Sequence, residues 1–180
     1  MSVIVRRLGP ADGDDYRTIR LAALATAPEA FGSTYAAEVV RPAAAFAERL
    51  SQAVVFGAYG DGQIVGMAGY RRHDGLKDQH KGSVWGVYVE PRWRGQGVAG
   101  ALMEAVIEVA RGEVEQLLLA VVQGNDGALA LYRRLGFEIY GVEPRALKTG
   151  NGYADEALMV RFLHRGGYEE SPTTSRTRSL

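Results

Sequence analysis

Residues 87–100 read Val-Tyr-Val-Glu-Pro-Arg-Trp-Arg-Gly-Gln-Gly-Val-Ala-Gly, and this stretch decides the fold. An apolar run ending at Pro91 predicts a strand, and the pattern from Val98 onward predicts a helix. The glycines between them let backbone N–H groups approach an anion closely. The helix that begins there directs the positive end of its dipole at the same place. The order of strand, glycine turn and helix therefore predicts a diphosphate site.

The composition indicates one globular domain with balanced charge. The chain has 180 residues, of which 47% are hydrophobic, and this length can bury a sizeable core. Lys and Arg together number 21, as do Asp and Glu, so the formal net charge is zero. That balance argues against a general nucleic-acid coat or a polybasic membrane binder. We expect residues 1–165 to form the domain and the polar residues 166–180 to form a disordered tail.

The chain contains no cysteine, which excludes disulfides, cysteine metal ligands and a cysteine acyl-enzyme intermediate. His73, His80 and His164 are scattered along the sequence, and we predict no metal site. Residues 1–7 lack the apolar core of a signal peptide. No apolar run approaches the roughly 18 residues that a membrane span requires. We therefore expect a cytoplasmic protein with no membrane partner and no nucleic-acid partner.

Periodicity and turn residues predict a mixed α/β domain in the order β-α-α-β-β-β-α-β-α-β-β. We expect a central sheet of about six to seven strands flanked by about four helices. Asp12 or Asp14 is expected to cap the first helix, and Pro28 to end it. Strand 117–122 is expected to be buried on both faces, residues 31–35 to form a loop, and Tyr153 to lie in the last loop. The expected strands are 3–8, 53–59, 64–71, 83–89, 117–122, 137–142 and 157–163, and the later helices are 42–50, 98–110 and 127–135.

Two kinds of diphosphate ligand fit the glycine turn. Gly95-Gln-Gly97-Val-Ala-Gly100 matches the G-x-G-x-x-G fingerprint of dinucleotide-binding folds. In those folds the first glycine follows the strand directly, whereas here residues 91–94 stand between. Strand 117–122 is followed by Gln123 and Gly124 rather than by the acidic residue that the fingerprint requires. A dinucleotide-binding oxidoreductase therefore remains only as an alternative, as does a turn without any ligand.

The same residues resemble the GNAT superfamily of N-acetyltransferases, whose donor is acetyl-coenzyme A. Arg94-x-x-Gly97-x-Ala99 resembles the family's pyrophosphate-binding signature, Arg/Gln-x-x-Gly-x-Gly/Ala. Val87-x-Val89-x-Pro91 resembles its fourth strand. A second block, Asn125-x-x-Ala128-x-x-x-Tyr132-x-x-x-Gly136-Phe137, follows at the family's spacing and resembles a later strand-to-helix segment. The resemblance covers roughly residues 3–163, and it identifies the chain as a GNAT member whose substrate is unassigned.

The resemblance implies that acetyl-CoA is held mainly by backbone groups. In the family, the fourth strand carries a bulge and splays from the fifth, which frees a strand edge for the pantetheine arm. Tyr132 is implied as the general acid near the thioester sulfur, although packing on a helix face is the alternative role. Asn125 either contacts the pantetheine or caps its helix. The implied cofactor-binding residues are Val87, Val89, Arg94, Gly95, Gln96, Gly97, Val98, Ala99, Gly100, Asn125 and Tyr132.

The sequence leaves the general base and the acceptor open. Glu90 is one candidate base beside the expected cleft, and Asp155 and Glu156 are others. Because the chain has no cysteine, we expect direct attack in a ternary complex by a primary amine of a small molecule, a protein N-terminus or a lysine. A non-catalytic acyl-CoA-binding sensor on the same fold is the alternative, and a homodimer is left open. The acceptor-site candidates are Phe31, Tyr35, Glu38 and Tyr153.

Overall fold

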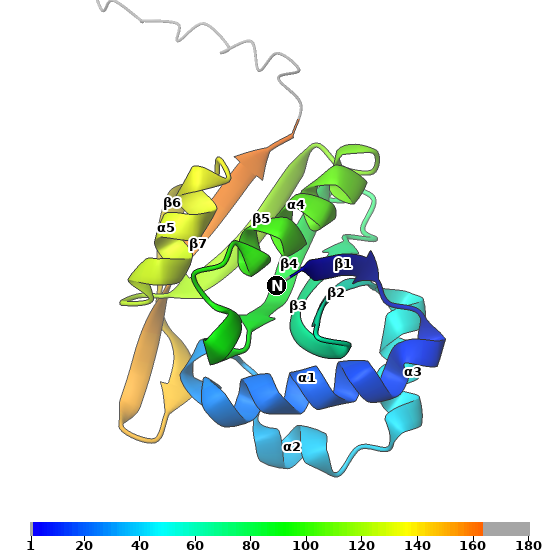
Figure 1. The fold of residues 1–180 in the computed structure, drawn as a ribbon. Helices are drawn as coiled ribbons and strands as arrows, with labels where there is room; N and C mark the ends of the chain where they lie inside the picture. Colours follow the sequence, from blue (N-terminus) through cyan, green and yellow to red (C-terminus); the bar gives the residue numbers. More distant parts are fainter. Residues whose placement is uncertain (1, 164–180) are drawn as a thin grey trace, which may run out of the picture.

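The computed structural model describes residues 2–163, which form one seven-stranded mixed sheet with helices on both faces (Figure 1). The sheet order is β1-β2-β3-β4-β5-β7-β6, and every neighbouring pair is antiparallel except β4 and β5. The predicted fold class is thereby confirmed, whereas the predicted boundary at residue 165 and the tail beyond it lie outside the described residues. The strands are β1 (Val3–Arg7), β2 (Val54–Gly60), β3 (Gln63–Arg72), β4 (Lys81–Val89), β5 (Gln116–Val122), β6 (Glu138–Thr149) and β7 (Gly152–Phe162). The helices are α1 (Gly13–Thr26), α2 (Tyr35–Val39), α3 (Ala43–Gln52), α4 (Val98–Arg111) and α5 (Asp126–Arg134).

Two hydrophobic clusters lie on opposite faces of the sheet. Neighbouring strand residues alternate between them, because side chains of a strand point to opposite faces. On β2, for example, Val55 packs with α1 and α3, whereas Phe56 packs with α4. Helix α4 contributes a stripe that includes Leu102 and Val106, which are fully buried at the predicted helical spacing. The sheet is therefore a middle layer, and its two faces present different chemistry.

The segment between α1 and α3 differs from the prediction. Helix α2 begins at the last residue of the expected loop 31–35, in a segment for which no helix was predicted. The domain therefore has five α-helices where about four were predicted. Thr34 caps α2 by accepting from the Ala37 N–H at 3.3 Å. A helix of five residues is too short to show an apolar period, so the pattern gave no sign of it.

Asp12 precedes α1 but does not cap it with its side chain. Its carboxylate instead accepts from the Arg6 guanidinium at 2.8 Å and from the Gly9 N–H at 2.8 Å. The hydrogen bonds from Arg6 and Gly9 hold the pKa of this carboxyl below its usual value. The predicted cap at Asp12 is therefore wrong, because a long-range ion pair with β1 competes for the carboxylate.

The last two strands are longer than predicted, and Tyr153 lies on β7 rather than in a loop. They form one hairpin whose far end projects beyond the sheet, at the lower left of Figure 1. Most residues from Glu143 to Thr149 are exposed, and Pro144 interrupts the pattern, so alternation could not reveal a strand there. Backbone pairing with β7, rather than burial, keeps this part of β6 extended.

Strand β5 alternates between buried and more exposed positions, so the predicted burial on both faces is wrong. Leu117, Leu119 and Val121 pack in the α4 cluster, whereas Ala120 is exposed on the opposite face. Helices α1 and α3 pack over β2 and β3, and they leave this part of the sheet open. The unbroken apolar run of residues 117–122 therefore did not mean that both faces of β5 are covered.

Strand β4 carries the irregularity that positions the site. Its register with β3 shifts so that Gly86 and Val87 together oppose one residue, a β-bulge in which Gly86 has a φ of +65°. Pairing with β5 involves only Lys81 to Ser83, after which the two strands separate. The bulge and the separation, both expected from the resemblance, open the sheet at the carboxyl end of β4.

Candidate active site

The glycine turn forms a cradle of free backbone donors at the start of α4. Gly95 and Gly97 have φ values of +73° and +81°, a conformation that glycine adopts without steric cost. Within the described chain, the N–H groups of residues 95–100 donate to no backbone carbonyl. A Cβ built on Gly95, Gly97 or Gly100 would meet nothing within 4 Å, so the space above the turn is open. The turn therefore offers aligned N–H groups and the positive end of a helix dipole to an anion.

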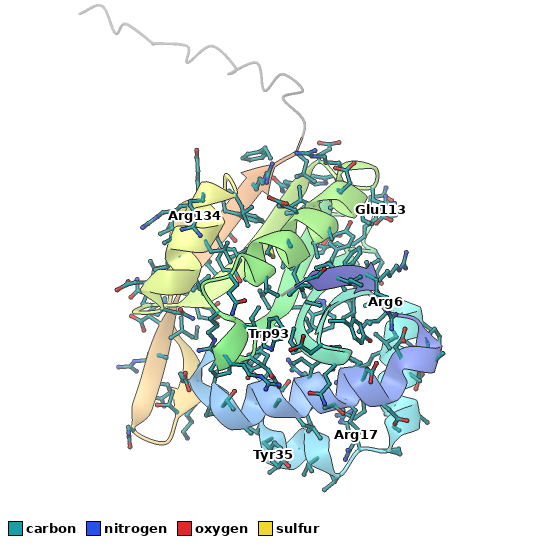
Figure 2. The ribbon with its side chains drawn as sticks, in the orientation of Figure 1. Arg6, Arg17, Tyr35, Trp93, Glu113 and Arg134 are labelled. Atoms are coloured by element: carbon teal, nitrogen blue, oxygen red, sulfur yellow. The ribbon has the colours of Figure 1, made fainter. Side chains whose placement is uncertain are left out.

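A cleft of about 870 Å³ extends from this turn, which is within the usual size of a cofactor site. Four segments wall it: the end of β4, the start of α4, the β5–α5 region, and residues 27–31 after α1. Trp93, labelled near the centre of Figure 2, lies between the glycine turn and α1 and is almost fully buried. The cleft thus joins both faces of the sheet at the point where β4 and β5 separate.

Tyr132 lines this cleft from α5 and is only 7% exposed. Its ring packs edge-to-face against Phe137, with the ring centres 5.9 Å apart. Burial raises the pKa of the Tyr132 phenol well above its ordinary value, because the anionic form would be desolvated. The hydroxyl consequently stays protonated at neutral pH, and it can donate a proton to a group inside the cleft.

Arg94 and Asn125 line the cleft, and both also have local structural roles. The Arg94 Nε donates to the Val89 carbonyl at 2.9 Å, which fastens the turn to the end of β4. The Arg94 guanidinium also lies 5.7 Å from the centre of the Tyr88 ring. The Asn125 side chain accepts from the Ala128 N–H at 3.3 Å and so caps α5. Each residue therefore helps to fix the element on which the cleft depends.

A family model for the acetyltransferase (GNAT) family matches residues 48–137, which is half of the 180-residue chain. The matched part runs from α3 through the glycine turn to the end of α5. The chain belongs to the GNAT acetyltransferase family. The predicted identification is thereby confirmed, and the matched range includes the glycine turn.

Two curated relatives of this chain carry names that specify different amine substrates. An L-methionine sulfoximine/L-methionine sulfone acetyltransferase from Pseudomonas aeruginosa is 33% identical over 102 residues, which cover 54% of this chain and 58% of the relative. An N-alpha-acetyltransferase from Mycobacterium tuberculosis is 36% identical over 105 residues, covering 58% of this chain and 63% of the relative. The chain thus spans less than two thirds of either relative's length.

Solved structures show the same fold for this acetyltransferase over nearly its whole length. A GNAT acetyltransferase from Streptococcus pneumoniae superposes with a TM-score of 0.80 at 22% identity, covering 91% of this chain and all of the other. A Salmonella typhimurium protein solved with its cofactor acetyl-CoA superposes with a TM-score of 0.78 at 18% identity, covering 95% and 99% of the two chains. The open N–H groups and the size of the cleft in this acetyltransferase fit such a ligand.

The predicted acceptor residues of the acetyltransferase separate into two groups. Phe31 lines the cleft, whereas Tyr35, Glu38 and Tyr153 do not. Glu38 is 4% exposed and is paired with Arg49 at 2.8 Å and with Arg20 at 3.8 Å. Tyr153 lies on the projecting hairpin, stacked with the Arg145 guanidinium at 5.4 Å. Glu38 is therefore part of a buried ion-pair network beneath the acceptor side, and not a free wall residue.

The candidate base Glu90 points away from the cleft toward solvent-exposed Arg92, with 3.4 Å between the charged atoms. Gln96 also lies outside the lining, since its side-chain amide donates to the Arg92 carbonyl at 2.9 Å. Every other predicted cofactor-binding residue lines the cleft. The structure thus brings the motif residues together and leaves the acceptor side to side chains from distant segments.

Sequence reasoning identified Phe31 but missed its neighbours Ala27, Glu29 and Ala30, which also wall the cleft. It missed Arg134 as well. Arg134 follows Arg133 in the last turn of α5, where basic residues are common because they complement the helix dipole. Because the helix dipole already accounts for a basic residue at this position, the sequence did not reveal that Arg134 lines the cleft. Among residues 2–163, no group of three His, Asp or Glu residues could hold a metal ion. In the same range, no helix is long and apolar enough to span a bilayer.

Proposed function

We propose that this acetyltransferase transfers an acetyl group from acetyl-CoA to a primary amine, by direct attack in a ternary complex. The observation that carries the proposal is one cleft that contains both the free N–H groups of residues 95–100 and the protonated hydroxyl of Tyr132. The first group suits a pyrophosphate and the second suits a leaving thiolate. The whole chain lacks cysteine, so a cysteine acyl-enzyme is excluded.

Residues of β4, α4 and α5 hold the donor in this proposal. The N–H groups of residues 95–100 bind the pyrophosphate, and Arg94 and Arg134 add positive charge at the rim of the cleft. Val87 and Val89 offer backbone groups to the amide-like pantetheine arm, since β4 has separated from β5 there. When bound, acetyl-CoA supplies an activated acetyl thioester. The enzyme gains rate by holding this group beside the amine.

Tyr132 is the proposed general acid. Its buried phenol keeps its proton at neutral pH, and it can pass that proton to the sulfur as the carbon–sulfur bond breaks. Packing alone does not require a hydroxyl at this position, because the edge-to-face contact with Phe137 is made between the two rings. A positioned acid therefore explains why a tyrosine rather than a phenylalanine faces the cleft.

Glu156 is the proposed base. It lies on β7 directly opposite Val122, which lines the cleft at the end of β5. Burial and the neighbouring carboxylate of Glu143 raise the pKa of Glu156 above its ordinary value. A raised pKa makes the carboxylate a stronger base at neutral pH. Neither Glu156 nor Glu90 belongs to the cleft lining, but the carboxylate of Glu90 is paired with Arg92, so Glu90 has no such role in this proposal.

The acceptor reaches the thioester from the α1 side of the sheet, past Phe31 and Tyr88. Relatives whose names specify an amino-acid derivative and an N-terminal amine support a primary amine as acceptor. Tyr88 is fixed there, because its hydroxyl shares a hydrogen bond with Thr26 at 2.7 Å. The entrance is therefore a rigid wall, which suits selection of one amine class.

Two measurements test the proposal. Calorimetry should detect acetyl-CoA binding, and a panel of amino acids, polyamines, aminoglycosides and peptides should include an amine that releases CoA. A thiol reagent reports that release directly, since the protein contributes no thiol. Absence of acetyl-CoA binding to folded protein would reject the proposal. Binding without release by any amine would instead favour a non-catalytic acyl-CoA sensor.

A further inference from the structure

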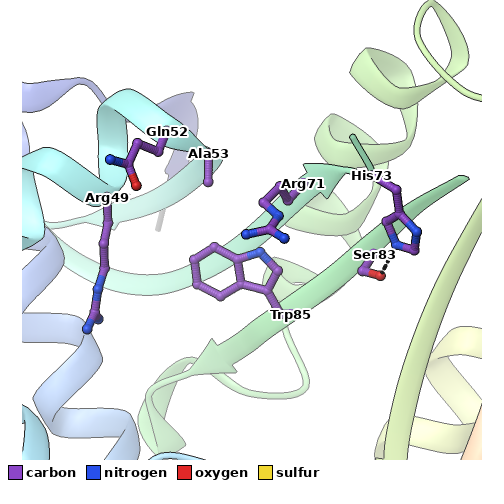
Figure 3. A pocket seen from close by; sticks show the side chains of 7 residues that line it. All are labelled: Arg49, Gln52, Ala53, Arg71, His73, Ser83 and Trp85. Atoms are coloured by element: carbon purple, nitrogen blue, oxygen red, sulfur yellow. Dashed lines mark hydrogen bonds between the residues drawn. The ribbon is translucent and has the colours of Figure 1, made fainter. Parts of the chain in front are cut away.

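A second cavity, of about 320 Å³, lies between α3 and the strands β3 and β4, outside the cleft described above (Figure 3). Its wall includes Arg49 from α3, Arg71 and His73 at the end of β3, and Ser83 and Trp85 on β4. In Figure 3 the Arg71 guanidinium and the Trp85 indole both point toward the middle of the cavity. The cavity therefore combines a cation with a flat apolar surface, which suits an organic anion.

The charges around this cavity favour an anion. Arg49 is neutralised by Glu38 at 2.8 Å, whereas within residues 2–163 no carboxylate lies within 4 Å of the Arg71 guanidinium. Arg20 lies behind the same region, with its Nε buried and without a hydrogen-bond partner among the described residues. Three guanidinium groups therefore lie near two carboxylates, that of Glu38 and, behind His73, that of Asp78, so net positive charge remains for a ligand.

His73 fixes one wall of the cavity. Its Nδ1 lies 3.2 Å from the Asp78 carboxylate, and its Nε2 lies 2.8 Å from the Ser83 hydroxyl. Asp78, His73 and Ser83 are arranged in the order of a catalytic triad. Ser83, however, lies in the middle of the sheet, paired with Arg71 and Leu118. In this described part of the sheet, no pair of free N–H groups faces Ser83 as an oxyanion hole would require. The hydrogen bonds among these side chains therefore hold His73 and Ser83 in place as polar residues of the cavity wall.

The cavity and the cleft lie along the same face of β4. Trp85 packs against Gly69 and Tyr88 pairs with Met67, so both side chains point to the α1 side, on either side of the bulge. Three residues of strand span roughly 10 Å. Arg20 lies between them, with its NH1 3.7 Å from where a Cβ on Gly86 would be. An extended aliphatic chain needs about eight bonds to cover that distance, so an acceptor whose amine reaches the cleft can place a group about eight bonds away in the cavity.

We infer that this cavity binds the carboxylate of the acceptor, with Arg71 as the pairing cation and Trp85 as the apolar floor. The inference rests on the proposed function and names its substrate class: primary amines that carry a carboxylate several bonds away from the nitrogen. Amines without that carboxylate can still enter the cleft, but they lack the charge-assisted hydrogen bond to Arg71.

The test compares 8-aminooctanoate with heptylamine, which lacks only the carboxylate, in the wild type and in Arg71→Gln. We expect the wild type to favour 8-aminooctanoate at least 10-fold in kcat/KM. Arg71→Gln should lower that value about 10- to 100-fold, mainly through KM, with the loss confined to the amine that carries the carboxylate. Arg72→Gln is the matched control, because Arg72 is the next residue of β3 and donates instead to the Gln79 carbonyl. An equal effect of Arg71→Gln on both amines, or no wild-type preference, would overturn the inference.

Binding without turnover separates the inference from the proposed function. The indole N–H signal of Trp85 in an NMR titration with 8-aminooctanoate should shift in the wild type and in Arg72→Gln, and not in Arg71→Gln. Trp85→Phe assigns that signal, since the chain has two tryptophans. A shift without any CoA release rejects the proposed function but keeps the carboxylate site. No shift in the wild type rejects the carboxylate site, whatever the enzyme acetylates.

Discussion

The donor side and the acceptor side of the cleft are built in opposite ways. The donor side uses backbone groups of one continuous segment, residues 87–100, together with the start and inner face of α5. The proposed acceptor side uses the side chains of Phe31 and Tyr88, and the guanidinium of Arg20, which belongs to the Arg20–Glu38–Arg49 network, lies 5.2 Å from the centre of the Phe31 ring. A site made of backbone depends on local conformation, whereas a site made of side chains depends on packing between distant elements. The two sides should therefore fail in different ways when they are mutated.

The largest effect is expected on the donor side, from Gly97→Arg. The new side chain would enter the open space above the turn and block the N–H groups there. Each hydrogen bond to a charged group contributes about 1.5–3 kcal/mol, so losing several should weaken acetyl-CoA binding more than about 1,000-fold. Calorimetry measures the loss. Gly62→Arg is the control, because Gly62 has a similar φ of +78° in the β2–β3 turn, far from the cleft. Equal losses in both variants would attribute the effect to backbone strain.

A smaller effect is expected where the donor side meets the chemistry. Tyr132→Phe should lower kcat about 10- to 1,000-fold, because it removes one positioned acid, while acetyl-CoA affinity changes little. Release of CoA measures kcat, and calorimetry measures affinity. Tyr70→Phe is the matched control, since Tyr70 is equally buried in the same cluster but does not line the cleft. An unchanged kcat in Tyr132→Phe would assign this tyrosine to packing.

The acceptor side should lose stability when its network is broken. Glu38→Gln leaves the guanidinium groups of Arg20 and Arg49 without their carboxylate, and Arg20 is 7% exposed. Breaking a buried pair by removing one partner costs about 3 kcal/mol, which urea unfolding would measure. Glu48→Gln is the control, because Glu48 lies on α3 and, within residues 2–163, its carboxylate accepts a hydrogen bond only from the exposed Gln52 side chain. Equal stability of the two variants would show that the network contributes little.

The smallest effect concerns Glu156, whose pKa is raised by burial and by Glu143. When the pKa of a carboxyl is higher in the folded state than in the unfolded state, the folded protein loses stability as the pH rises through that pKa. Glu156→Gln should therefore increase the free energy of unfolding by about 0.5 kcal/mol at neutral pH, and should change little below about pH 4, where the carboxyl is protonated. Urea unfolding at both pH values measures this difference.

Glu143→Gln separates the two roles of Glu156. It removes only the repulsion across β6 and β7 and leaves Glu156 buried, so it should give a smaller gain in stability than Glu156→Gln. Only Glu156→Gln should also lower kcat, because only Glu156 is proposed as the base. Equal kcat values in the two variants and the wild type would leave deprotonation of the amine to water.

Much of the fold could be predicted because the sheet half from β1 to β4 follows local rules. The Asp61-Gly62 turn between β2 and β3 has positive φ values at both residues, which the sequence predicted as a hairpin. The apolar stripe of α4 predicted that helix to within one residue. In contrast, α2 and the outer part of β6 have no apolar period, because capping and backbone pairing stabilise them. Periodicity detects burial, so it cannot detect elements that bury little.

The sequence by itself determined the glycine turn that we propose as the donor site, because residues that bind a diphosphate through N–H groups must be adjacent in the chain. It also determined the family, whose model matches residues 48–137. Only the tertiary structure decided that Glu38 is a buried ion-pair partner and that Arg71 and Trp85 share a cavity. The physical reason is that these contacts join segments that meet only when α1, α3 and the sheet pack together.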